Sequence, residues 1–204
     1  MPTPAERPTH HPTKEKLILT VVQMLEERPN EVGIEEILKT SGVSTGSMYH
    51  HFEDVDHLIE TAYARRFSMF VDISNAMIAQ ALGEANSKEE MIQALFEVTQ
   101  KTQAPELAPV RYERARIVAM AQHNERFRGA LQVEQARLTE ALTDLFRELQ
   151  NQGWMNTNFD PKAAAVMIQA YTLGKVVDDF AAEPMDPDEW KKIIDLLLLN
   201  VFAA

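Results

Sequence analysis

Apolar residues recur at three- and four-residue intervals along most of the chain, which is the spacing of one face of an α-helix. The first such face contains Leu17, Val21 and Leu25, and Pro29 ends the pattern. Strand-length alternation of apolar and polar residues is missing, and so is any repeat at the period of a solenoid. The pattern therefore predicts an all-α fold.

Capping and stop residues divide this pattern into about nine helices. A side chain that can accept a backbone hydrogen bond precedes most segments, and Ser87 with Glu90 has the spacing of a capping box. Gly42 and Gly153 stand where helices should stop. The predicted helices cover residues 13–28, 34–40, 44–52, 55–82, 88–103, 110–122, 125–152, a segment from 161 and a segment from 187. The predicted caps are Thr13, Ser44, Asp54, Ser87, Asn124, Asp160 and Asp186.

The lengths of these segments predict two domains and an arm. The first three helices are short, and a glycine turn joins the second to the third, as in a helix-turn-helix unit. We expect a disordered, proline-containing arm at residues 1–12, a helix-turn-helix domain at 13–54, and a helical bundle at 55–204.

The third helix, in the stretch GVSTGSMYHHF at residues 42–52, has two edges of different character. Met48 and Phe52 lie one turn apart and, with Val43, form an inward edge. The other edge carries hydroxyls, a phenol and an imidazole, which can contact phosphates and base edges in a major groove. Alternatively, the hydroxyls only start the helix and Tyr49 packs against the domain.

The stretch ILKTSGVSTGSMYHHFEDVDHLI resembles the DNA-binding signature of the TetR (tetracycline-repressor) family of transcriptional regulators. The shared order is a glycine turn, a cap, a small residue, an aromatic residue, a histidine and a phenylalanine, and the resemblance covers about residues 13–60. It implies that Ile37, Val43, Met48 and Phe52 hold the head together. The residues that it places at DNA are Lys39, Ser44, Thr45, Gly46, Ser47, Tyr49 and His50.

The charge of the chain argues against nucleic acid, because phosphate contact normally needs a basic surface. The net charge is −11, and residues 1–58 contain five Lys or Arg against ten Asp or Glu. Family members often have Lys at the positions of Thr45 and Val55, and acidic residues surround Val55 here. Binding could rely on other cations and the arm, be weak and limited by salt, or be lost. The cations available for the first interpretation, which we favour, are Lys14, Lys16, Arg28 and Lys39.

A cluster of His, Asp and Glu around the end of this helix has the donor types of a metal site. Its members are His50, His51, Glu53, Asp54, Asp56 and His57. Because the cluster crosses a predicted helix end, its side chains should not converge as an i, i+4 pair does, and we expect no metal. The chain has no cysteine, which excludes disulfides, thiolate zinc sites and cysteine nucleophiles. We expect no cofactor.

The two C-terminal segments predict a surface for pairing with a second copy. Small and apolar residues recur at helical spacing in PKAAAVMIQAYTLGKVVDDFA, and the last helix is apolar round much of its circumference. The resemblance implies the same, since TetR-like proteins pair through their last two long helices. The alternative is that both helices fill a monomer core. The expected interface residues are Ala163, Met167, Ala170, Gly174, Val177, Trp190, Ile194, Leu197 and Val201.

The resemblance also implies a pocket for a small apolar or amphipathic effector inside the larger domain. Methionines give an adaptable lining, and a few polar groups orient the ligand, although each residue could instead belong to the core. The candidates are Phe70, Met77, Met91, Phe96, Tyr112, Met120, His123, Phe127, Met167 and Tyr171. Residues 111–128 concentrate arginines that could attract an anionic effector, and we favour a solvated helix face with internal ion pairs for them.

The sequence therefore predicts a ligand-responsive transcriptional regulator, in the first place a repressor, that binds a palindromic DNA operator as a homodimer. The alternative is a helical partner-binding or sensor protein that has lost DNA binding. The sequence shows no nucleophile with a neighbouring base, so we expect that the protein is not an enzyme. Without a signal peptide or a stretch long enough to span a bilayer, we expect a cytoplasmic protein with no membrane contact.

Overall fold

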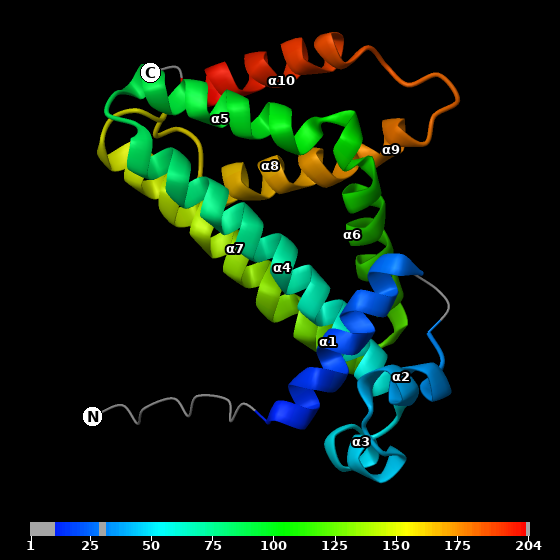
Figure 1. The fold of residues 1–204 in the computed structure, drawn as a ribbon. Coiled ribbons are helices and arrows are strands. Elements are labelled where there is room, and N and C mark those ends of the chain that lie inside the picture. The colour runs from blue at the N-terminus through cyan, green and yellow to red at the C-terminus, as the bar shows by residue number, and fades with distance from the viewer. Residues whose placement is uncertain (1–10, 29–31, 203–204) are drawn as a thin grey trace, which may run out of the picture. The chain divides into compact units, whose positions relative to one another are not determined.

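The computed structural model describes residues 11–28 and 32–202, and every regular element among them is a helix (Figure 1). The all-α prediction is confirmed. The chain forms two compact units that meet in sequence between Ser68 and Met69. This division lies within helix α4 (Val55–Glu84), whereas we predicted a domain boundary before it, at residues 54–55. Most of the predicted arm, residues 1–10, lies outside the described residues.

The first unit is a small helical head. Helix α1 (Pro12–Glu27) packs against both α2 (Ile34–Ser41) and α3 (Thr45–His51), and the start of α4 completes the head. The predicted inward edge of α3 is buried at both its long side chains, while Val43 is half-buried. The buried apolar residues of this unit include Leu17, Ile18, Val21, Leu25, Ile37, Met48, Phe52, Leu58, Ala62 and Tyr63.

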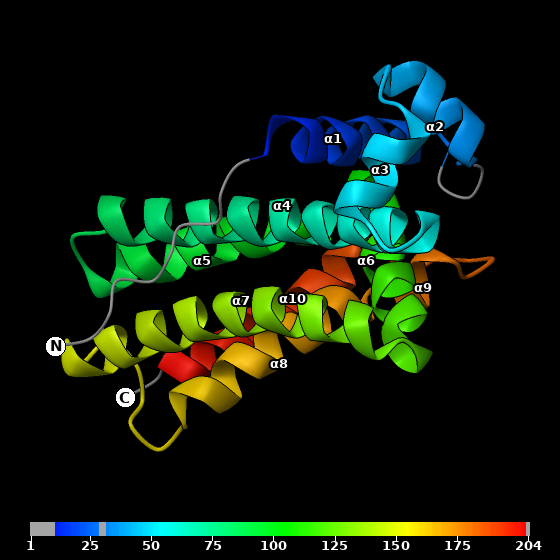
Figure 2. The ribbon, with the colours of Figure 1, turned by 90° about the horizontal axis from the view of Figure 1, so that it is seen from below.

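The second unit consists of the rest of α4 and the helices that follow. These are α5 (Lys88–Gln103), α6 (Ala108–Met120), α7 (Glu125–Asn151), α8 (Pro161–Gly174), the four-residue α9 (Val176–Asp179) and α10 (Pro187–Phe202). Helix α7 packs along α8, α5 lies against α8 and α10, and α6 contacts α8 and α9. In Figure 2, α8 and α10 both lie on the side of this unit opposite α4 and α5. Its core includes Met91, Ile117, Phe127, Leu138, Leu145, Phe146, Leu149, Ala165, Ile194 and Leu198.

Hydrogen bonds at the helix starts confirm most of the predicted caps. The side-chain oxygen accepts a bond from a first-turn backbone N–H at Ser44 (3.2 Å), Asp54 (2.6 Å), Ser87 (3.1 Å), Asn124 (2.9 Å), Asp160 (2.7 Å) and Asp186 (2.9 Å). The Thr13 cap is wrong: α1 begins at Pro12, whose fixed φ suits the first helical position, and His11 precedes it without a capping bond. Glu90 accepts from the backbone N–H of Asn86 at 2.7 Å, one residue before the predicted partner.

A buried ion pair ties α6 to α9 and to the end of α5. Arg111 donates from Nε and Nη2 to the two carboxylate oxygens of Asp179, at 2.6 and 2.8 Å, and from Nη1 to the backbone carbonyls of Thr102 and Ala104. Both charged side chains are less than 5% exposed. The hydrogen bonds from Arg111 hold the pKa of Asp179 below its ordinary value. The expectation of a solvated arginine face is therefore wrong for Arg111.

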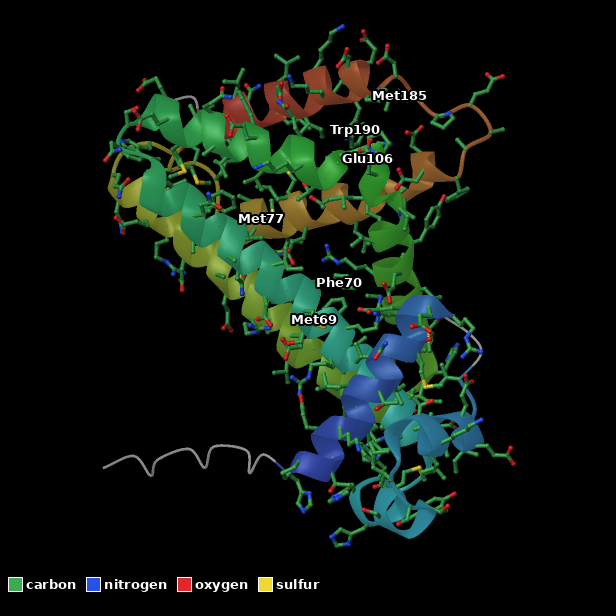
Figure 3. The ribbon with its side chains drawn as sticks, in the orientation of Figure 1. Met69, Phe70, Met77, Glu106, Met185 and Trp190 are labelled. Carbon is green, nitrogen blue, oxygen red and sulfur yellow. The ribbon has the colours of Figure 1, made fainter. Side chains whose placement is uncertain are left out.

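A second polar contact joins α10 to α5. The indole Nε1 of Trp190, labelled in Figure 3, donates to Oε1 of Gln103 at 3.1 Å. The Gln103 side chain is buried, so this bond satisfies one of its polar atoms away from water. None of the described helices is both long enough and apolar enough to cross a membrane.

Candidate nucleic-acid interface and ligand cavity

Helix α3 is held from one side and exposed on the other. Gly42 adopts a left-handed φ of 63°, which lets the chain turn from α2 into the Ser44 cap. Met48 and Phe52 are buried beneath α3, each 2% exposed or less. The candidate DNA contacts Ser44, Thr45, Gly46, Tyr49 and His50 are all exposed, and Ser47 is half-buried. The outward edge that the sequence predicts is therefore accessible, with half of the Tyr49 surface open to solvent (51%).

All four cations that we expected to support DNA binding are exposed to solvent. Lys14, Lys16 and Lys39 are exposed, and the Lys14 ammonium lies 5.5 Å from the centre of the Phe52 ring, within cation–π range. The fourth cation, Arg28, forms an ion pair with Glu36, which neutralises part of its charge. The lysines therefore remain the stronger candidates for phosphate contact.

Three histidine rings, those of His11, His50 and His51, lie close together at α3. The rings of His11 and His51 lie 4.2 Å apart between centroids, and those of His50 and His51 lie 5.0 Å apart. Burial and the charges of His11, His50 and Lys14 together lower the pKa of His51. Protonation of His51 therefore becomes more favourable when a negative charge, such as a phosphate, approaches.

Two residues of the predicted cluster of acids and histidines, Asp54 and His57, form hydrogen bonds at the start of α4. The backbone N–H of His57 donates to Asp54 at 2.6 Å, and its ring Nδ1 accepts from the backbone N–H of Glu53 at 3.3 Å. These bonds hold the chain between α3 and α4 in a fixed turn. Within the described residues, no group of three or more His, Asp or Glu side chains is arranged to hold a metal ion.

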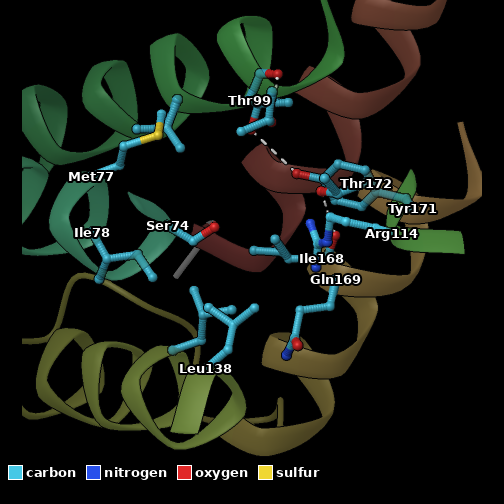
Figure 4. Close-up of a pocket in the computed structure, with 13 residues that line it drawn as sticks. Ser74, Met77, Ile78, Thr99, Arg114, Leu138, Ile168, Gln169, Tyr171 and Thr172 are labelled. Carbon is cyan, nitrogen blue, oxygen red and sulfur yellow. Dashed lines mark hydrogen bonds between the residues drawn. The ribbon is translucent and has the colours of Figure 1, made fainter. Parts of the chain in front are cut away.

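A cavity of about 80 Å³ lies within the second unit, among α4, α5, α6, α7 and α8 (Figure 4). Its lining residues are Ser74, Met77, Ile78, Val98, Thr99, Thr102, Arg114, Leu138, Leu142, Ile168, Gln169, Tyr171 and Thr172. Figure 4 shows Arg114, Tyr171 and Thr172 at one end, and Met77 and Ile78 at the other. The cavity therefore has a polar end and an apolar end.

Two of the ten residues that we expected around an effector line this cavity, Met77 and Tyr171. Met91 and Phe127 are buried elsewhere in the core, and Phe70, Phe96 and Met167 are half-buried away from the cavity. Tyr112, Met120 and His123 are exposed. Helical periodicity identifies the face of a helix that turns inward, but it does not show which inward faces enclose a space.

The polar end of the cavity is organised by α5, α6 and α8. The hydroxyls of Thr99 and Tyr171 share a hydrogen bond of 3.2 Å. Burial raises the pKa of the Tyr171 phenol, and a nearby Asp195 adds to that effect while the bond from Thr99 opposes it. Burial also lowers the pKa of the Arg114 guanidinium, which nevertheless stays charged at neutral pH. Arg114 is one of the arginines at residues 111–128 that we considered for an anionic effector and assigned to a solvated helix face, whereas Thr99 was not among the predicted residues.

The C-terminal helices present apolar side chains to solvent. Ala163, Ala170, Gly174 and Val177, from the stripe that we expected to pair with a second copy, are exposed. On α10, the exposed apolar side chains are Ile193, Leu196, Leu197 and Leu199. Together these residues form what we call the C-terminal apolar surface.

Two residues of the predicted pairing surface face the interior instead. Ile194 and Val201 are 2% and 6% exposed and belong to the core of their own chain. The last helix is apolar on two sides, so its sequence alone does not show which side faces inward. Met167 and Trp190 are half-buried.

Comparisons of the sequence identify a family. A profile described as that of the BetI-type transcriptional repressor, C-terminal, matches residues 88–202, more than half of the chain. No curated protein matches the sequence.

Solved structures extend the likeness over nearly the whole chain. A TetR-family transcriptional regulator from Cytophaga hutchinsonii superposes with a TM-score of 0.70 at 12% identity, covering 98% of this chain and 100% of that one. GusR of Salmonella enterica gives 0.67 at 18% identity, with 97% and 99% covered. Reduced NemR of E. coli gives 0.64 at 18% identity, with 95% and 98% covered. At these identities the comparison establishes a shared fold.

Proposed function

We propose that this chain, which belongs to the TetR family of transcriptional regulators, is a non-enzymatic, ligand-responsive repressor. It binds a palindromic operator as a homodimer and leaves the operator when a small effector occupies the cavity. The observation that carries this proposal is the exposed polar edge of α3, held in place by the buried Met48 and Phe52.

The chemistry of α3 suits a major groove. Ser44 and Thr45 stand at the helix N-terminus, where hydroxyls and backbone N–H groups can bind a phosphate. Tyr49 and His50 reach farther and can contact base edges or phosphates. Gly46 has open space where a side chain would begin, so a DNA strand can approach the backbone closely. The exposed Lys14, Lys16 and Lys39 supply the cations.

A homodimer accounts for the C-terminal apolar surface. Isolated apolar side chains on a protein surface are ordinary, whereas the exposure of four leucine and isoleucine side chains on the single helix α10 favours an interaction site. A two-fold dimer that binds DNA needs its two copies of α3 about 34–36 Å apart, or a multiple of that distance, and so selects a palindrome. Small residues such as Ala163, Ala170 and Gly174 allow the paired helices to approach closely.

Helix α4 supplies a route from the cavity to the head. It begins three residues after Phe52, and its residues Ser74, Met77 and Ile78 line the cavity. A ligand that displaces these side chains acts on the same continuous helix that leads out of the DNA-binding turn. A coupling free energy of about 1–3 kcal/mol between the two sites would be sufficient to lower operator occupancy markedly.

The dimer and the operator are tested together. We expect light scattering to give twice the chain mass of 23.1 kDa, and Val177→Glu combined with Leu197→Glu to give a monomer. Val133→Glu, which alters an equally exposed apolar residue on α7, should remain a dimer. A palindromic duplex selected from a random pool should bind the wild type about a hundred-fold or more tightly than its isolated half-site.

A monomeric wild type, or one that binds both duplexes equally, would contradict the homodimer and palindrome proposal.

A second function has a specific observation in its favour. The Arg28–Glu36 ion pair and the acidic turn at Glu53 and Asp54 weaken the positive field of the head, as expected of a partner-binding protein that no longer contacts DNA. Failure to select any duplex at low salt would support that function.

A further inference from the structure

A second cavity lies between the end of α5 and the first two turns of α10, with a volume of about 240 Å³. We infer that this α5–α10 cavity binds a small neutral aromatic molecule that carries a carbonyl group, with the ring on Trp190 and the carbonyl oxygen on the side-chain amide of Gln103. The site is separate from the proposed effector cavity, although Thr99 lines both. The inference therefore does not depend on the proposed function.

The amide of Gln103 contains a donor that the described part of the chain leaves without an acceptor. The Gln103 side chain lines the cavity, and the residue is 8% exposed. Its Oε1 accepts from the indole of Trp190, which can only donate, so the orientation of the amide is fixed. The buried Nε2 has no hydrogen-bond partner among the described residues. A ligand oxygen that accepts from Nε2 would therefore add a hydrogen bond that the free protein lacks.

A small rotation of this amide connects Nε2 to the cavity. Nε2 is covered from solvent in the free protein, although other atoms of Gln103 line the cavity wall. The last torsion of a glutamine side chain is broad, so turning the amide needs little energy. A carbonyl is the matching group on the ligand, because it accepts a hydrogen bond and brings no donor that would need a partner of its own.

Trp190 and its neighbours provide a surface for an aromatic ring. Trp190 lies in the first turn of α10 and is half-buried, and its bond to Gln103 restrains the indole. Aromatic rings pack on an indole in offset-stacked or edge-to-face geometry. Pro105, Pro187 and Ile194 line the same cavity and are apolar. A flat apolar ligand therefore meets a largely apolar surface with one polar group that can orient it.

The charges around the cavity favour a neutral ligand. The ammonium of Lys175 lines the cavity and is already paired with the carboxylates of Asp178 and Asp179, at 2.5 and 3.5 Å. The other charged residues described in the lining are Asp188 and Lys191, which have opposite charges and are both exposed. An ionic ligand would lose hydration here without meeting an excess of opposite charge.

The cavity lies on the side of α10 that packs against α5. Trp190, Ile194 and Leu198 follow one another at intervals of one helical turn, and Ile194 and Leu198 are buried. The exposed Ile193 and Leu196, which belong to the C-terminal apolar surface, lie on other sides of the helix. A dimer formed through that surface would therefore use other sides of α10 than the one that lines this cavity.

The test uses Trp190 as its own reporter. The chain has two tryptophans, so Trp154→Phe leaves Trp190 as the only indole in the full-length protein. Benzamide should give a saturable change in the fluorescence of this variant. Cyclohexanecarboxamide, which lacks the aromatic ring, and toluene, which lacks the carbonyl, should each displace benzamide with an affinity about three- to tenfold weaker than its own. Benzoate should bind no more tightly than benzamide.

Three outcomes of this titration would overturn the inference. The first is the absence of a saturable change with benzamide. The second is an affinity for either matched ligand equal to that for benzamide, because the ring or the carbonyl would then contribute nothing. The third is tighter binding of benzoate, because the site would then select an anion.

Variants in the same background locate the ligand. Gln103→Met keeps the length of the side chain but removes the amide, and it should lower the affinity for benzamide to that for toluene. Lys191→Gln in the same cavity and Met77→Ala in the other cavity should leave the affinity unchanged. If Gln103→Met does not fold by circular dichroism, Gln103→Leu replaces it with the same expected result. Unchanged affinity after the loss of the amide, or an equal loss in Met77→Ala, would overturn the assignment.

Discussion

The edge of α3 and the cavity differ in how their residues are brought together. The candidate DNA contacts on α3 are neighbours in sequence, and one helix with two buried side chains presents them to solvent. The cavity collects residues from five helices between Ser74 and Thr172, and buried bonds such as Arg111–Asp179 hold the surrounding helices. We therefore expect changes on α3 to affect binding with little cost in stability, and changes around the cavity to affect stability as well.

The largest expected effect is on the buried ion pair. Asp179→Ala leaves the guanidinium of Arg111 buried without its carboxylate, which should lower the free energy of unfolding by about 3–5 kcal/mol. Urea denaturation measures this loss. Asp144→Ala, which removes an exposed partner of Arg147, should change stability by less than about 1 kcal/mol. Similar losses for the two variants would mean that Arg111 finds another partner and that the pair does not hold α6.

The next largest expected effect is on operator binding by the exposed edge of α3. Tyr49→Ala and His50→Ala should each weaken operator binding by about 1–3 kcal/mol, because each removes a side chain from the groove-facing edge. Both residues are exposed, so the unfolding free energy should change by no more than about 0.5 kcal/mol. Fluorescence anisotropy on a labelled duplex, together with urea denaturation, measures the two quantities. A large loss of stability without loss of DNA binding would reverse the roles that we assign.

Two glycines sharpen the comparison within the head. Gly42→Ala should destabilise the protein by about 1–2 kcal/mol, since its φ of 63° is strained for any residue with a Cβ. A Cβ there would lie 3.9 Å from the flexible Lys16 ammonium, so the cost arises from the backbone and not from a clash. Gly46→Ala, with open space and no positive φ, should keep or raise stability and weaken operator binding. Thermal unfolding measures the stability of both variants. Equal stability of the Gly42→Ala and Gly46→Ala proteins would contradict backbone strain at Gly42.

The smallest effect is a dependence on pH. Burial and the nearby charges lower the pKa of His51 in the free protein, and a bound phosphate would raise it again. The complex then takes up a proton, so operator affinity should rise as pH falls through the region near and below 6.5, by less than about tenfold per pH unit. The free protein should lose stability over the same range, because its unfolded state binds that proton more readily.

His51→Gln should flatten the pH dependence of operator affinity, and His123→Gln, in the second unit, should leave it unchanged. Anisotropy titrations at a series of pH values measure both. An affinity that rises with pH in the wild type would show that His51 does not approach a phosphate.

The sequence predicts the head better than it predicts the cavity, for physical reasons. Ser44, Asp54 and Asn124 were identifiable as caps because a cap acts within one helical turn. The buried position of Met48 and Phe52 followed from their spacing of one turn. These features depend on contacts between residues close in the chain.

The cavity and the inner side of α10 depend on contacts that are distant in the chain. Arg111 pairs with Asp179, which is 68 residues away in the chain, and Thr99 shares a hydrogen bond with Tyr171, which is 72 residues away. No local sequence pattern predicts either contact. Ile194 and Leu197 are both apolar and three residues apart, yet one is in the core and the other is exposed. Only the packing of α5 against α10 decides between them.

The central claim is that α3 binds DNA although the chain carries a net charge of −11. The most direct measurement is the affinity for the selected palindrome between 50 and 300 mM salt, for the wild type and for the Tyr49→Ala, His50→Ala double variant. We expect a steep linear fall of log affinity with log salt in the wild type, about 0.9 per phosphate neutralised, and no specific binding by the double variant, which remains a dimer. A wild type that does not bind at about 50 mM salt, or a double variant that binds equally well, would contradict the claim.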